Sequence, residues 1–167
     1  ILTYFVQTKV IKLNKKFWNI LIPKIDKNRI PINLYKLLDK IILNSNIIIP
    51  KNLIKIIGSS KICDDLWIFF KNLIDKKGAK VFDDECKTLI NNILSKIVFN
   101  KASSAFINFL NSYIYFINLE QNKIISSDPK NMNDYYVIDM PLTYFDLLIN
   151  TLLQVESDDI AKETSEV

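Results

Sequence analysis

Residues 59–78 read SSKICDDLWIFFKNLIDKKG, and this stretch carries a helix start, a helix stop and one apolar face. Its apolar residues recur at i, i+4, i+7, i+8 and i+11, namely Ile62, Leu66, Phe69, Phe70 and Leu73. Serines precede the pattern, two aspartates open it, and two lysines and Gly78 close it, as caps and the helix dipole favour. Trp67, Cys63 and Ile74 widen the apolar arc. We therefore expect a central helix that contacts two neighbouring helices.

Further apolar stripes at helical spacing lie on both sides of this helix. They predict helices over residues 2–21, 34–42, 51–57, 84–98, 103–117 and 142–152. Short links join the helices at 61–75, 84–98 and 103–117, so we expect consecutive helices to pack antiparallel, with the latter two beside the central one. The predicted fold class is all-α: an irregular bundle or a short helical-repeat-like array of about six to seven helices.

Several predicted helices begin at residues that can cap them. Asn33 precedes the helix at 34–42. The triplet Asp83-Asp84-Glu85 opens the helix at 84–98, and the pair Ser103-Ser104 opens the helix at 103–117. Thr143 and Asp146 have the spacing of a capping box, with Asp in place of the usual Glu. Helix capping therefore accounts for the polar and acidic residues at these positions.

The C-terminal third is less regular. Residues 118–134 are polar, so we expect a long loop there, and the alternative is a hairpin in which 113–119 pairs with 123–126. Residues 135–140 fit a short strand or an extended segment. Residues 154–167 are acidic and non-periodic, which predicts a disordered tail. We expect residues 1–153 to form a single domain, and the absence of an initiator Met suggests a fragment of a larger protein.

The composition argues against an enzyme. The chain has no histidine, two cysteines and two glycines, which removes the commonest general base, a four-ligand zinc site and a glycine-rich phosphate loop. The acidic clusters at 64–65 and 83–85 fit first helical turns better than acid/base or Mg²⁺ chemistry. We predict no catalytic residue, no metal ligand and no cofactor.

Cysteine and asparagine usage fits an intracellular, reducing location, either nuclear or cytoplasmic. Cys63 and Cys86 both fall on apolar faces, so we expect two core residues without a disulfide. The uncharged run at 102–119 is just long enough to suggest a membrane-spanning helix. Its polar residues, among them Asn118 and Ser112, instead favour a packed helix with one hydrated edge.

Charge is the strongest functional signal. Residues 1–61 hold 12 basic and 2 acidic side chains, whereas residues 62–167 hold 10 and 16. A basic first third attracts anions, although 29 Ile, 21 Lys and 18 Asn against one Arg also suggest codon bias. Two functions follow. The first is a non-catalytic protein-interaction or scaffold module with an acidic partner; the second is a nucleic-acid-binding domain without sequence specificity. The predicted anion contacts are Lys9, Lys12, Lys15, Lys16, Lys24, Lys27 and Arg29.

A docking surface for the protein partner is predicted on the N-terminal helix. Tyr4, Ile11 and Trp18 recur every seven residues and form a second, narrow apolar stripe. Such a stripe is either covered by a second neighbouring helix or exposed to a partner. A groove between helices is the other candidate docking surface.

Overall fold

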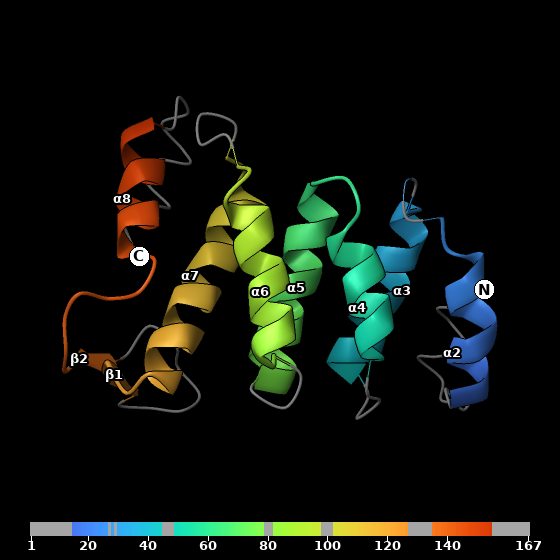
Figure 1. The fold of residues 1–167 in the computed structure, drawn as a ribbon, viewed down its shortest axis with the longest axis horizontal. Helices are drawn as coiled ribbons and strands as arrows, with labels where there is room; N and C mark the ends of the chain where they lie inside the picture. The colour runs from blue at the N-terminus through green and yellow to red at the C-terminus, as the bar shows by residue number, and fades with distance from the viewer. Residues whose placement is uncertain are drawn as a thin grey trace. The chain divides into compact units, whose positions relative to one another are not determined.

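The computed structural model of the chain describes residues 15–26, 28, 30–44, 49–78, 82–97, 102–126 and 135–154 (Figure 1). Within these ranges it contains seven α-helices, one 3₁₀ turn and a two-stranded sheet, which confirms the all-α prediction. The chain divides into two compact units, Ile1–Ser95 and Lys96–Val167. The single-domain expectation stays a prediction.

The first unit contains five of the helices, and within the described residues most of their bounds fall close to the predicted ones, although α6 ends at Leu94, before the predicted end at residue 98. They are α2 Lys15–Leu21, α3 Ile32–Asn44, α4 Lys51–Gly58, α5 Asp64–Lys77 and α6 Asp84–Leu94. The 3₁₀ turn η1, Ile22–Lys24, follows α2 because Pro23 lacks the N–H that a further α-helical turn needs. The rest of the predicted N-terminal helix, residues 2–14, lies outside the described ranges.

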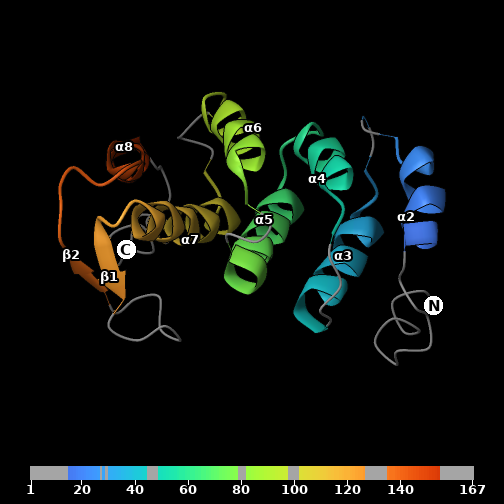
Figure 2. The same ribbon diagram turned by 60° about the horizontal axis from the view of Figure 1, so that its bottom comes forward.

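The first unit is a stack of two helical hairpins. Alternate helices share a layer: α3 and α5 lie side by side, and so do α4 and α6 (Figure 2). Lys51 contacts Asp83, Lys55 contacts Glu85 and Asn72 contacts Asp39, at sequence separations of 32, 30 and 33 residues. This near-constant separation places hairpin α5–α6 beside hairpin α3–α4 in the same orientation, as in helical-repeat arrays.

The apolar face of α5 forms the centre of the first unit, as predicted. Leu66, Phe69, Phe70 and Leu73 are fully buried, and Trp67 and Ile74 are almost so. The helix against which α5 packs most extensively is α3, two helices earlier in the chain, which the prediction did not name as a neighbour. The alternation between layers explains the difference, since it brings next-but-one helices together.

The predicted start of α5 was also wrong. Ser59 and Ser60 do not cap it; their hydroxyls donate to the carbonyls of Lys55 and Ile57 at the end of α4. The helix begins after Cys63, which is exposed, and Ile62 is exposed too. The end was predicted correctly: Gly78 follows the helix at φ +49°, a conformation that glycine adopts readily.

The caps of the other helices match the predictions in part. Asp83 accepts a hydrogen bond from the Cys86 backbone N–H, and Ser103 accepts one from Phe106. Asn33 lies inside α3, one residue after its start, so its predicted capping role was wrong. Cys86 is buried as predicted, and both cysteines are free.

The second unit contains α7 Ser104–Glu120, the strands β1 Ile124–Ser126 and β2 Tyr135–Val137, and α8 Phe145–Gln154. The strands pair antiparallel, with Ile125 opposite Tyr136. The predicted loop at 118–134 is therefore shorter, because α7 continues to Glu120 and β1 follows after a turn. The alternative hairpin correctly placed a strand at 123–126, but this strand pairs with β2 and not with residues 113–119. Residues 127–134 and 155–167, including the predicted tail, lie outside the described ranges.

The end of α7 is fixed to the segment before α8 by a buried amide. Asn118 is fully buried and exchanges two hydrogen bonds with the Thr143 backbone, at 2.8 and 3.1 Å. The predicted hydrated edge of α7 is thus wrong at Asn118 and at Ser112, which is also buried. The capping box is wrong as well, because the Thr143 hydroxyl donates to Gln121 Oε1 at 2.6 Å.

Candidate docking groove

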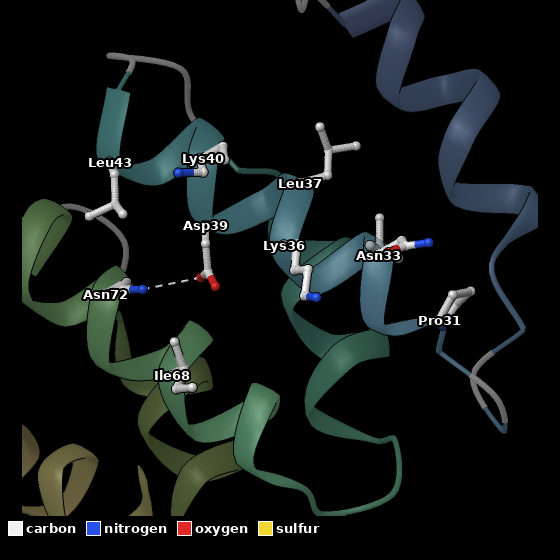
Figure 3. A pocket seen from close by; sticks show the side chains of 10 residues that line it. Pro31, Asn33, Lys36, Leu37, Asp39, Lys40, Leu43, Ile68 and Asn72 are labelled. Atoms are coloured by element: carbon white, nitrogen blue, oxygen red, sulfur yellow. Dashed lines mark hydrogen bonds between the residues drawn. The ribbon is translucent and has the colours of Figure 1, made fainter. Parts of the chain in front are cut away.

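A surface hollow of about 860 Å³ lies between α3 and α5 in the first unit, and we call it the α3/α5 groove (Figure 3). Six of its lining residues are exposed: Pro31, Asn33, Lys36, Lys40, Leu43 and Ile68. Leu34 and Leu37 are buried beneath it, and Asp39 and Asn72 are half-buried. It is therefore an open groove along two parallel helices.

The apolar residues of the groove belong to both helices. Leu43 near the end of α3 is 46% exposed, and Ile68 on α5 is 40% exposed. Most of the other apolar residues of α3 and α5 are buried, so the groove offers aliphatic surface above a packed floor.

Most of the polar residues of the groove lie on one stripe of α3. Asp39 and Lys40 follow Lys36 by three and four residues and therefore share a helical face with it. Asn72 on α5 donates a hydrogen bond of 3.2 Å to Asp39 Oδ1 (Figure 3). Burial raises the pKa of the Asp39 carboxyl above its usual value, while the Asn72 hydrogen bond and the charge of Lys40 oppose the shift.

The layer formed by α4 and α6 has a different surface. The lysines of α4 pair with the acidic start of α6, Lys51 with Asp83 and Lys55 with Glu85. The Lys51 hydrogen bond, together with the Cys86 backbone N–H, lowers the pKa of Asp83 to about 2. These lysines are thus compensated by acids one hairpin further along the stack.

Few of the residues predicted from sequence to make functional contacts fall within the described ranges. Lys16 and Lys24 are exposed, and the side chain of Lys15, at the start of α2, is not described. Trp18 is 5% exposed and packs edge-on against Phe17, so its ring does not offer a docking face. The other predicted contacts lie outside the described ranges, namely Tyr4, Ile11, Lys9, Lys12, Lys27 and Arg29.

None of the groove residues was predicted from the sequence. Lys36, Leu43 and Ile68 belong to ordinary amphipathic helices, and a groove between two helices depends on which helices become neighbours. The signal that could have found them is the apolar residue that falls outside its helix's buried arc, as Ile68 does on α5.

Among the residues that the structure describes, no helix combines the length and apolar character that crossing a bilayer requires. The same part of the chain holds no cluster of three or more His, Cys, Asp or Glu side chains suited to a metal ion.

Comparisons with family models, with curated proteins and with solved structures found no match to this chain. The function is therefore inferred from the groove and from the helical stack that forms it.

Proposed function

We propose that the chain is a non-catalytic protein-interaction module that binds an acidic partner. The observation that supports this most is the α3/α5 groove, an open apolar surface bordered by lysines on a stack of helical hairpins. Such stacks present extended surfaces that are used for binding. The groove holds aliphatic groups and a few polar side chains spread along its length, which suits a peptide segment better than a small ligand.

The charge distribution supports the acidic character of the partner. The first 61 residues carry a net charge of +10, and Lys36 and Lys40 bring part of that charge to the groove. Long-range attraction of this kind speeds association and selects partners by sign. The exposed lysines Lys16 and Lys24 would add to the attraction without contacting the groove residues.

The experiment that tests this function uses the whole 167-residue chain as bait in an extract of the cells that make it. One half of the extract is treated with nuclease, and the bound material is analysed for protein. We expect the same proteins to be captured from the treated and the untreated half. Loss of all captured protein after nuclease treatment would instead favour the nucleic-acid alternative, which a salt titration of a short duplex would then examine.

A further inference from the structure

We infer that the occupant of the α3/α5 groove is an amphipathic α-helix of a partner protein, with acidic residues beside its apolar stripe. This inference rests on the proposed function and names the partner chemistry of the same site. It follows from the shape of the groove, from its exposed side chains and from its charge.

The shape of the groove favours a helical occupant. The α-helices on both sides satisfy their own backbone groups, so they offer no open edge to which an extended peptide could add as a strand. A helix carries its own hydrogen bonds and can place one apolar stripe between two parallel helices. A helix of about 13 residues would match α3, which spans 13 residues.

The exposed side chains define what the occupant must offer. Leu43 and Ile68 are the most exposed aliphatic side chains of the groove, and they come from different helices. An occupant that covers both needs aliphatic residues at i, i+3 or i+4, and i+7 on one face. Covering two half-exposed aliphatic side chains at once gives the interface a small apolar centre.

Charge complementarity decides the polar residues of the occupant. Lys36 is exposed at the groove, whereas the half-buried Asp39 is held by Asn72 and faces the charge of Lys40. A carboxylate on the occupant would pair with Lys36 at the rim. A lysine placed there would be repelled, so reversing the charge at position 36 should reverse the preference of the groove.

A displayed library of 16-residue peptides tests this inference with the intact chain as bait. Its pools share a helix-favouring apolar stripe and differ in the flanking residues, which are acidic, basic or uncharged; a fourth pool is proline-rich and extended. We expect the acidic pool to be enriched. Enrichment of the proline-rich pool, or of no pool, would overturn the inference.

Variants locate the binding of the enriched peptides. We expect Ile68→Ser and Leu43→Ser each to weaken it at least tenfold, whereas Ile62→Ser should change it less than twofold. Ile62 is the matched control, because it is 39% exposed against 40% for Ile68 and does not line the groove. Equal binding by Ile68→Ser and wild type would contradict the inference.

Charge reversal gives a readout that does not depend on the apolar core. We expect Lys36→Glu to shift enrichment from the acidic to the basic pool, and Lys61→Glu, on an exposed lysine outside the groove lining, to leave it unchanged. An unchanged preference in Lys36→Glu would overturn the inference. If proteins from nuclease-treated extract still bind Ile68→Ser, the inference fails while the proposed function stands.

Discussion

Asn72 on α5 donates a hydrogen bond to Asp39 on α3 in the α3/α5 groove, and the carboxyl that accepts it is half-buried. Burial raises the pKa of Asp39 above its ordinary value of 3.8. The folded chain therefore holds this proton more tightly than the unfolded chain, so the free energy of unfolding falls as the pH rises through the window between the two pKa values. Above that window the carboxyl is ionised in both states, and the full cost of burying its charge is subtracted from the free energy of unfolding.

Replacing Asp39 with Asn should therefore stabilise the chain at neutral pH. Asn keeps an acceptor for Asn72 but has no charge to desolvate. We expect the variant to exceed wild type in free energy of unfolding at about pH 7, with a smaller difference near pH 4. Urea unfolding at several pH values measures this. A loss of more than about 1 kcal/mol at neutral pH would mean that the ionised Asp39 carboxylate contributes net stability.

Gly58 allows the two hairpins of the first unit to approach closely. A Cβ atom at this position would lie 2.5 Å from Leu89 Cδ2 on α6. We expect Gly58→Ala to lower the free energy of unfolding by about 1–3 kcal/mol, as overpacking does, although alanine is the better helix former. Denaturant unfolding measures the loss.

The same clash predicts a rescue. Shortening Leu89 removes the atoms that a Cβ at position 58 would meet, so Gly58→Ala should cost less in a Leu89→Ala background than in wild type. Equal costs in both backgrounds would show that the two residues are not coupled and that the hairpins do not meet there.

Asn118 should be the residue in the second unit whose loss affects the segment before α8 most directly. Replacing it with Ala leaves the Thr143 backbone N–H and C=O without this partner, at about 1–3 kcal/mol for each group that remains unpaired and buried. Hydrogen exchange at the Thr143 amide should accelerate. Asn108→Ala, on the exposed side of the same helix, serves as the control, and equal exchange in both variants would contradict the assignment.

Asp83 should make the first unit sensitive to acid. Its pKa is lowered to about 2 because Lys51 and the Cys86 N–H donate hydrogen bonds to it, so its contribution is present above pH 3.8 and is lost as the pH falls toward about 2. Asp83→Asn keeps a capping oxygen and should remove this part of the acid transition. Acid unfolding followed by circular dichroism measures it, with the exposed Asp84→Asn as control; identical wild-type and Asp83→Asn transitions would be the contrary result.

The fold was predictable where periodicity alone determines it. The buried face of α5 and the glycine at its end follow from spacing and from glycine's freedom to adopt positive φ. The neighbours of α5 could not be predicted, because the sequence that links two helices does not determine whether they share a layer. Asn118 was misplaced for a related reason: a polar residue is buried when a distant backbone segment satisfies it, and Thr143 is 25 residues away.

A groove between helices could be expected from the sequence, but the residues that line it could not be predicted. Lys36 and Ile68 lie 32 positions apart and become neighbours through the stacking of the hairpins. Trp18 shows the converse, since its position on an apolar stripe was read from sequence, but its burial depends on contacts that spacing does not specify. Charge asymmetry was visible from composition, and the residues that bring it to a groove were not.

A comparative capture from nuclease-treated extract, with wild type, Ile68→Ser and Ile62→Ser as baits, decides whether the α3/α5 groove is the binding site. Quantitative mass spectrometry reports the amount of each captured protein. We expect the proteins bound by wild type to be retained by Ile62→Ser and depleted at least tenfold by Ile68→Ser. The same proteins at equal amounts on all three baits would contradict the claim that the α3/α5 groove is the binding site.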